Sequence, residues 1–408
     1  MNTCPRNVKV VDPQSEYHND WVTITIEEGF IADIEPADEG HRCVSPGWVD
    51  TGAHLCDPGH EHKESLSALA RAAAFGGFTD VLCYPNTLPA TDDSSAVSAL
   101  VSRSKGLPVN LHFMGALTPG ASENDLAELY DMHQAGALAF SDGRRESLNS
   151  SLVKRALHYM QAFGGLLLMY PNDRYLGYGA QMNESEESVY LGMKGSPEMA
   201  ETAALASILH IHEYTGGRLH LQPLTSARSL HMAQGREGIS TAVSIAHLAW
   251  DDSAVRSFDT NYKINPPLRS KSQREALIQA LADGKVDALC SYHQAQSVEE
   301  KLVEWPFAEP GMLALQTLFP LAMKHLVHPG HINLDQLISM LTSGPRRLLG
   351  LEPLIIDHDV EARITVFDPE EAWTFSKETM FSRAVNSPLI GERLKGKAID
   401  LQSLMFDR

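Results

Sequence analysis

The stretch GWVDTGAHLCDPGHEHKES, residues 47–65, contains the residue types that hold metal ions in proteins: imidazoles, a thiol and carboxylates. Two histidines one residue apart on a strand can reach the same ion, but only His54 is present here, and Gly52 stands two residues before it. Zinc held by three or more imidazole and carboxylate ligands lowers the pKa of its bound water from about 15.7 to about 7, which supplies hydroxide at neutral pH. A single imidazole cannot do this.

Two other groups in this region carry chemistry-bearing atoms. The run HEHKE, residues 60–64, offers further imidazoles and carboxylates, but it lies in a polar loop past the expected strand, and we expect it to be solvated rather than to form a replacement metal site. Cys56 and Cys290 have no obvious activating base beside them in the sequence. We therefore expect buried, inert thiols rather than nucleophiles.

The elements that would position these residues alternate along the middle of the chain. Short apolar runs of strand type, such as TDVLCYP, VNLHFMG, ALAFSD, GGLLLMYP, RLHLQPLTSA and VDALCSY, are separated by helical segments. Repetition of strand and helix over residues 47–352 predicts a parallel sheet, and an α/β protein with a (β/α)₈ TIM-like barrel suits that length. In such a barrel, chemistry takes place at the carboxyl ends of the strands.

The two ends of the chain have a different pattern. Residues 7–46 and 361–375 alternate apolar and polar side chains, which is the period of half-buried strands. We expect the ends, residues 1–46 and 353–408, to pair into one small, discontinuous β domain beside the barrel.

Composition limits the classes of partner. The chain has 408 residues, of which 43% are hydrophobic and 21% charged, and its apolar runs are far shorter than the roughly 20 residues of a membrane helix. Its formal net charge of −19 makes nucleic acid a repelled partner. Five scattered cysteines without a Cys-x-x-Cys pair indicate free thiols. We expect a cytoplasmic protein that binds neither nucleic acid nor membranes.

Longer motifs carry a family resemblance. PGWVDTGAHLCDPGHEHKES, AAAFGGFTDVLCYPNTLPATDD, GALAFSDG, MNESEESVYLGMKGSPEMAE, DTNYKINPPLRS, DGKVDALCSYH, FDPEEAWTF and NSPLIGERLKGK occur in this order along nearly the whole chain. Together they resemble the dihydroorotases of the amidohydrolase superfamily. The resemblance implies an amidohydrolase-type barrel with a β domain from both ends and, in active members, a zinc-activated hydroxide that opens or closes the dihydropyrimidine ring.

The same resemblance implies that zinc ligands are missing. The family's Asp-x-His-x-His-x-Arg falls on residues 50–56, so Gly52 replaces one imidazole and Cys56 replaces the arginine that binds the substrate carboxylate. In MYPNDRYL, Tyr170 occupies a ligand position, and a phenol with a pKa of about 10 is a poor zinc ligand at neutral pH. In RLHLQPLTS, His220 is kept, but Pro223 replaces a liganding histidine and has no donor atom in its side chain.

The proton-transfer group is missing as well. In LCSYHQAQ, Tyr292 stands where the family has its catalytic aspartate, which is both general base and ligand, and Gln296 stands where a substrate-binding histidine is expected. The site therefore has no catalytic residue at the family positions. With Gly52, Tyr170, Pro223 and Tyr292 at ligand positions, no metal and no other cofactor are expected.

Some positions still match the family. His54 and Asp142 correspond to ligands, and Asn86, Asn265 and His293 correspond to substrate-binding positions. Four of them also have a structural interpretation: His54 as a hydrogen-bonded core histidine, and the asparagines and Asp142 as side chains that cap turns. We regard all five as vestigial.

Three hypotheses for function follow. The first is a non-catalytic dihydroorotase-like subunit of pyrimidine biosynthesis that holds aspartate transcarbamoylase in a homo- or hetero-oligomer, because stretches such as LTSAR and AEPGMLALQTLFPLA resemble that subgroup. The second is an active dihydroorotase or related cyclic amidohydrolase, with a reduced or rearranged zinc site using His54, Asp142 and His293. The third is a small-molecule binding module that uses the vacated pocket with Asn86 and Asn265.

Overall fold

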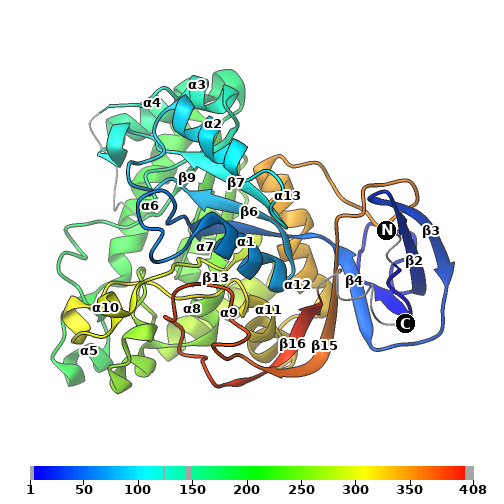
Figure 1. Cartoon of the computed structure of the whole chain (residues 1–408). Coiled ribbons are helices and arrows are strands. Elements are labelled where there is room, and N and C mark those ends of the chain that lie inside the picture. The colour runs from blue at the N-terminus through cyan, green and yellow to red at the C-terminus, as the bar shows by residue number, and fades with distance from the viewer. Residues whose placement is uncertain (1–3, 123–124, 144–148, 400–408) are drawn as a thin grey trace.

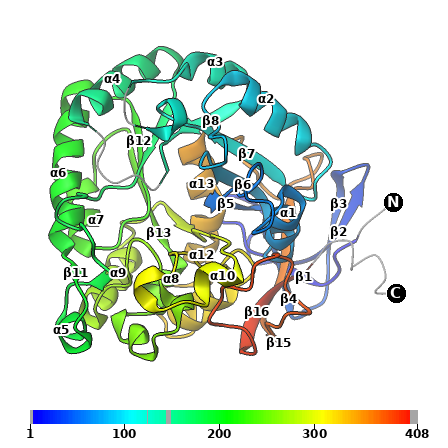
Figure 2. The ribbon, with the colours of Figure 1, turned by 60° about the vertical axis from the view of Figure 1, so that its left-hand side comes forward.

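The computed structural model describes residues 4–122, 125–143 and 149–399. Its centre is a barrel of eight parallel strands with helices packed around the outside (Figures 1 and 2). In their order around the sheet, the barrel strands are β5 (Trp48–His54), β6 (Phe78–Tyr84), β7 (Asn110–Gly115), β8 (Ala137–Phe140), β9 (Leu166–Met169), β12 (Arg218–Leu221), β13 (Ile239–Ser244) and β14 (Ala288–Cys290). The predicted (β/α)₈ barrel is confirmed.

Hydrogen bonds between β5 and the residues that directly follow β14 bring the barrel close to closure. The main-chain N–H of His54 donates to the carbonyl of His293 at 2.8 Å. The carboxylate of Asp50 accepts from the N–H of Ser291 at 2.6 Å and from its hydroxyl at 2.7 Å. Burial raises the pKa of Asp50, although these hydrogen bonds oppose the shift. These side-chain hydrogen bonds therefore connect the two edges of the sheet, where the main-chain hydrogen bonds between β5 and β14 are incomplete.

The helices follow the strands in chain order. They are α1 (Leu66–Phe75), α2 (Ser94–Arg103), α3 (Leu129–Gln134), α4 (Ser150–Met160), α5 (Glu186–Leu191), α6 (Glu198–Thr215), α7 (Ala227–Ala233), α8 (Ile245–Ala249), α9 (Lys271–Ala282), α10 (Val298–Lys301), α11 (Leu318–Ala322), α12 (Leu334–Leu341) and α13 (Ser343–Leu349). Their starts carry side-chain caps. The Ser65 hydroxyl accepts from the N–H of Ala68 at α1, and Ser270 forms a capping box with Gln273 at α9.

Two apolar layers hold the barrel together. The inner layer consists of buried side chains of seven barrel strands and of α13. They are Val49, Leu82, Met114, Ala139, Leu168, Ala242, Ala288, Leu348 and Leu349. Side chains from seven strands can meet one another only inside the barrel, so the barrel is filled rather than hollow. A larger outer cluster lies between the strands and the surrounding helices.

A second sheet is built from both ends of the chain, as predicted. Its strands, in spatial order, are β16 (Arg393–Ile399), β15 (Ile364–Thr374), β4 (Arg42–Pro46), β1 (Val8–Val10), β2 (Trp21–Glu27) and β3 (Phe30–Pro36). β15 pairs antiparallel with β4, while β1 and β4 are parallel, so the sheet is mixed. The domain boundaries at residues 46 and 353 stay a prediction, and the outermost residues of that expected domain, 1–3 and 400–408, lie outside the described residues.

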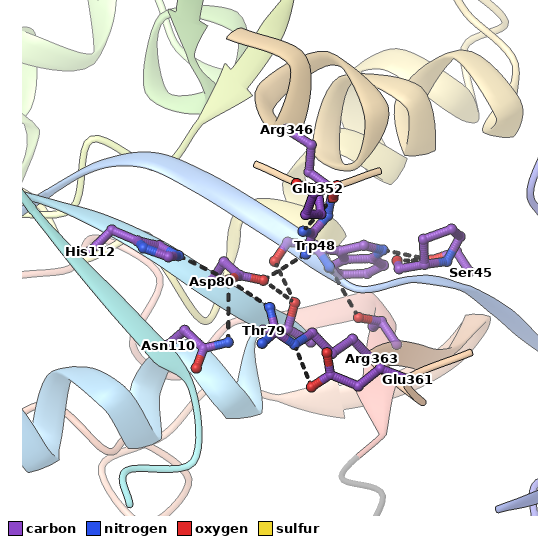
Figure 3. Close-up of polar contacts among 12 residues, drawn as sticks. Ser45, Trp48, Thr79, Asp80, Asn110, His112, Arg346, Glu352, Glu361 and Arg363 are labelled. Carbon is purple, nitrogen blue, oxygen red and sulfur yellow. Dashed lines mark hydrogen bonds and ion pairs between the residues drawn. The ribbon is translucent and has the colours of Figure 1, made fainter. Parts of the chain in front are cut away.

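A buried charge network joins the base of the barrel to this sheet (Figure 3). Asp80, at the start of β6, is fully buried and accepts from Arg346 of α13 at 2.6 Å and from His112 of β7 at 2.9 Å. Arg363, one residue before β15, lies 3.7 Å from the same carboxylate. Burial raises the pKa of Asp80, but His112 and Arg346 outweigh it and bring the pKa down to about 2.

Among the described residues, no helix has the length and apolar character needed to cross a membrane.

Candidate functional site

The carboxyl ends of the barrel strands bring most of the sequence-predicted residues together at one end of the barrel. These are His54 at the end of β5, Asn86 after β6, Asp142 after β8, Tyr170 after β9, Pro223 after β12, Asn265 after α8, and Tyr292 and His293 after β14. The part of the chain that the structure describes contains no group of three or more histidine, cysteine, aspartate or glutamate side chains arranged to hold a metal ion. The individual contacts explain why.

Gln222 fills the space beside Gly52. A Cβ atom built on Gly52 would lie 2.1 Å from Gln222 Nε2 and 3.0 Å from the ring of Tyr84. The Gln222 amide donates to the Thr51 carbonyl at 3.0 Å and to the Tyr84 hydroxyl at 3.1 Å. Its oxygen accepts from the Thr51 hydroxyl at 2.5 Å. A side chain at position 52 would clash with this amide unless Gln222 moved.

His220 is part of the same cluster. Its Nε2 lies 3.0 Å from Gln222 Oε1, and its Nδ1 lies 2.9 Å from the hydroxyl of Ser240. Burial lowers the pKa of His220, so the ring is neutral at physiological pH. Since both ring nitrogens are within hydrogen-bond distance of a partner, neither points a spare lone pair towards the mouth of the barrel.

His54 is packed between aromatic rings. It stacks on Tyr84 with ring centroids 4.6 Å apart and an interplanar angle of 18°, and its edge meets Tyr292 at 5.5 Å. Only 6% of His54 is exposed. Tyr292, whose ring lies beside His54, adopts a left-handed backbone conformation with φ +52°. The position expected to carry the family's general base therefore holds an aromatic packing partner.

Asp142 and Asn86 brace neighbouring loops. Both carboxylate oxygens of Asp142 accept from Thr118, one from its N–H at 3.0 Å and the other from its hydroxyl at 2.6 Å. The Asn86 amide donates to the Asp142 carbonyl at 3.2 Å. A Cβ on Gly143 would lie 1.8 Å from Asn86 Oδ1, so the two loops are in close contact. Both side chains therefore have structural partners, although these lie in neighbouring loops rather than in the turns that the sequence led us to expect.

His293 holds together segments far apart in the sequence. Its Nδ1 accepts from the N–H groups of Ala314 and Leu315 at 3.1 and 3.3 Å, which places the proton on Nε2. That nitrogen lies 2.9 Å from Glu64 Oε2 and donates to it. His293 is 1% exposed, as is Glu64. His293 is thereby fixed by structural partners rather than directed towards a substrate.

The loop 60–64 is exposed only in part. Glu61 and His62 face solvent, as expected. The expectation was wrong for Glu64, which is buried against His293, and for Lys63, which forms an ion pair with Glu300 at 2.6 Å and donates to Gln296 at 2.9 Å. Lys63 and Glu64 were expected to be solvated because they are charged, but partners far away in the sequence bury them in part or in full.

The cysteines near the site are buried. Burial raises the pKa of Cys56 to about 12, and it raises the pKa of Cys290 well above the usual value. Such raised pKa values make both thiols poor nucleophiles at neutral pH.

A cavity of about 600 Å³ opens beside these residues. It is lined by segments that follow β9, α8 and α10, among them Asn265, Arg174 and Lys263. The hydroxyl of Tyr170 donates to Asn265 Oδ1 at 3.4 Å. Of the two asparagines predicted to line a retained pocket, Asn265 lines this cavity, whereas Asn86 is absent from its described wall.

Zinc does not fit the side chains present. His54 stacks on Tyr84, Asp142 accepts from Thr118, and His293 donates to Glu64. A tetrahedral zinc site needs at least three such donors directed at one point. It remains a prediction that the family's ligand positions fall on Gly52, Tyr170, Pro223 and Tyr292. Among the described residues, however, no three histidine, cysteine, aspartate or glutamate side chains are directed at one point.

Comparison with known proteins identifies the family. A model of dihydro-orotase-like proteins matches residues 41–229. The chain is 35% identical over 413 residues to a protein named dihydroorotase from Geobacter sp. (strain M21), covering 98% of this chain and 97% of that relative. It is 36% identical over 372 residues to a dihydroorotase from Ruminiclostridium cellulolyticum, covering 90% of this chain and 87% of the relative.

Solved structures show the same fold at lower identity. L-hydantoinase (dihydropyrimidinase) from Arthrobacter aurescens matches with a TM-score of 0.83 at 20% identity, covering 97% of this chain and 93% of that one. Dihydropyrimidinase from Brevibacillus agri NCHU1002 matches with a TM-score of 0.81 at 18% identity, covering 98% and 94%. With a full-length relative at 35% identity and this barrel, the chain belongs to the dihydroorotase-like family of the amidohydrolase superfamily.

Proposed function

We propose that this protein is a non-catalytic member of the dihydroorotase family. The observation that carries the proposal is the packing at the end of β5, where Gln222 fills the space beside Gly52 and His54 lies between Tyr84 and Tyr292. Hydrolysis or closure of a dihydropyrimidine ring in this family needs a metal-activated hydroxide and a carboxylate base. Neither group has a place in this packing.

The role we propose is structural. The barrel serves as a cytosolic subunit that holds aspartate transcarbamoylase in an assembly of pyrimidine biosynthesis. Support for this partner comes from the resemblance of stretches such as LTSAR and AEPGMLALQTLFPLA to dihydroorotase homologues of that kind. A structural role also fits the intact barrel framework, in which Asp50 closes the barrel and Asp80 links its base to the mixed sheet.

Co-expression with the aspartate transcarbamoylase of the same organism tests the partner. A single large species in size-exclusion chromatography with light scattering, containing both chains in a fixed ratio, is the expected result. Two separate species at micromolar concentration would contradict the scaffold role.

A second candidate function is an active cyclic amidohydrolase with a reduced metal site. It is favoured by the names of the relatives, which are called dihydroorotases and align over 98% of this chain. It requires His54, Asp142 and His293 to leave their present partners and converge on one ion. Turnover of dihydroorotate or carbamoyl aspartate by the purified protein, abolished by His54→Ala, would establish this function in place of the first.

A further inference from the structure

A cavity of about 420 Å³ lies on the outer wall of the barrel, between α9 and the π-helical turn η6 (Met323–Val327) that directly continues α11. Figure 1 shows α9 and α11 next to each other on this wall. The cavity shares no described lining residue with the one at the barrel mouth. Its hydrogen-bond donors are Arg274 and Gln279 of α9, Lys324 and His325 of η6, and His331 of the turn that follows.

The turn η6 departs from regular helix geometry. The N–H of His328 donates to the carbonyl of Met323, five residues earlier, at 2.8 Å, whereas an α-helix pairs residues four apart. Such π-helical turns are rare and occur frequently at functional sites. Lys324 and His325 both belong to this turn and both line the cavity. The irregular turn and the cavity therefore coincide.

The donors of this cavity have hydrogen-bonding capacity to spare. Among the residues that the structure describes, the side chains of Lys324, His325 and His331 form no hydrogen bond and no ion pair. Arg274 is engaged in part, because its Nε lies 3.6 Å from Asp251 Oδ2 and its Nη1 donates to two main-chain carbonyls of α8 at 3.3 and 3.4 Å. These contacts position the guanidinium at the cavity and leave its Nη2 without a hydrogen bond to the described residues.

The His325 ring shows the sign of the local electrostatic potential. Burial lowers its pKa, and the charges of Lys324 and Arg274 lower it further, to about 4. The charges that act on this ring are therefore those of two cations, although the whole chain carries a net charge of −19. The acid of the lining is Glu275, at an exposed position. The two cations attract an anion, and at neutral pH the uncharged imidazole can donate one N–H to it.

We propose that the cavity between α9 and η6 binds a phosphate-type oxyanion, which is either inorganic phosphate or the phosphate group of a small molecule. Phosphate oxygens accept several hydrogen bonds at once, and bonds from lysine and arginine to such an anion are stronger than neutral ones. The volume of about 420 Å³ lies within the range of small-molecule sites, about 300–1,000 Å³. The proposal goes beyond the scaffold role and does not depend on aspartate transcarbamoylase.

Nuclear magnetic resonance of the full chain with isotope-labelled histidine tests this at pH 7, and the His325 signal is identified by its loss in His325→Gln. Inorganic phosphate, adenosine monophosphate and acetate are titrated separately at constant ionic strength. At least one phosphate ligand should shift the His325 signal to saturation, and the tighter of the two identifies the source. Acetate should bind at least about threefold more weakly. Lys324→Gln should weaken phosphate binding about threefold to fivefold, and Glu275→Gln should strengthen it by a similar factor.

Matched controls make the same changes in charge elsewhere. Lys105→Gln and Glu237→Gln lie at exposed positions outside the lining of the cavity and should leave the affinity unchanged. His210, whose side chain is 90% exposed, supplies the reference signal. The proposal is overturned if neither phosphate ligand shifts His325 more than His210, or if acetate binds as tightly as phosphate. It is equally overturned if a control substitution changes the affinity as much as its counterpart at the cavity.

Discussion

The side-chain amide of Gln222 and the missing side chain of Gly52 occupy complementary positions: Gln222 Nε2 lies 2.1 Å from the point where a Cβ at position 52 would stand. The two residues lie on different strand ends, 170 positions apart in the sequence. The absence of a side chain at Gly52 provides the space that the Gln222 amide occupies. This amide donates to the Thr51 carbonyl and the Tyr84 hydroxyl.

Gly52→Ala should therefore lower the free energy of unfolding by about 1–3 kcal/mol through overpacking. In a Gln222→Ala background, the added cost of Gly52→Ala should fall markedly, because the clashing amide is gone. Urea denaturation of the four proteins in this cycle measures the coupling. Gly177→Ala, whose Cβ would have no neighbour nearer than 3.4 Å, is the control. Equal costs in both backgrounds would refute the pairing.

His293 should behave as a structural residue. Glu64→Ala removes a buried acceptor from the Nε2 proton and should cost about 1–3 kcal/mol of stability. His293→Ala should cost at least as much, since it also leaves the N–H groups of Ala314 and Leu315 without this acceptor. His62→Ala, at an exposed position in the same loop, should change stability by less than about 0.5 kcal/mol. Substitutions at His293 that spare stability but abolish ligand binding would point instead to a substrate-binding residue.

The barrel fold and the mixed sheet follow from the sequence, because strand and helix periods are local properties of the chain. The places of His54, Asp142 and Tyr292 at strand ends follow for the same reason. The burial of Glu64 could not be predicted, since its partner His293 lies 229 positions away. Gln222 was missed because a glutamine has no motif of its own, although Pro223 beside it marked the position.

The charge network at the base of the barrel predicts a specific dependence on pH. The pKa of Asp80 is about 2 in the folded protein against an ordinary 3.8, so its stabilising effect is complete above about pH 4 and is lost as the pH falls towards 2. Asp80→Asn leaves Arg346 buried without its counter-charge and should cost about 3–5 kcal/mol at pH 7. The difference from the unmodified protein should narrow at pH 3.

Chemical denaturation at pH 7 and pH 3 measures this difference. Asp38→Asn, at an exposed position, should have almost no effect at either pH. A constant gap between the unmodified protein and Asp80→Asn at both values would show that the carboxylate charge is not what stabilises the base.

The reactivity of the cysteine thiols tests whether the residues at the mouth of the barrel are buried. Burial raises the pKa of Cys43 to about 11 and of Cys56 to about 12, and Cys83 and Cys290 are also buried. Only Cys4 is partly exposed. At pH 8, iodoacetamide should modify one thiol rapidly in the native protein and all five after unfolding. Rapid native labelling of Cys56 or Cys290 would indicate an open, reactive centre.

The cavity beside Asn265 predicts how a ligand would behave. If the cavity retains affinity for dihydroorotate or carbamoyl aspartate, the midpoint of thermal unfolding should rise at millimolar ligand, and Asn265→Ala should reduce that rise. Asn86→Ala should not reduce it, because Asn86 is engaged with the loop of Asp142. Absence of a shift in the unmodified protein would remove the binding-module hypothesis.

Zinc content is the most direct test of the central claim that the barrel mouth cannot hold a catalytic metal. The protein would be produced in zinc-supplemented medium, passed through a desalting column and analysed by plasma mass spectrometry alongside a dihydroorotase assay. The account predicts well under one zinc per chain and no turnover above background. One or more zinc ions per chain, together with turnover that a chelator removes and zinc restores, would contradict it.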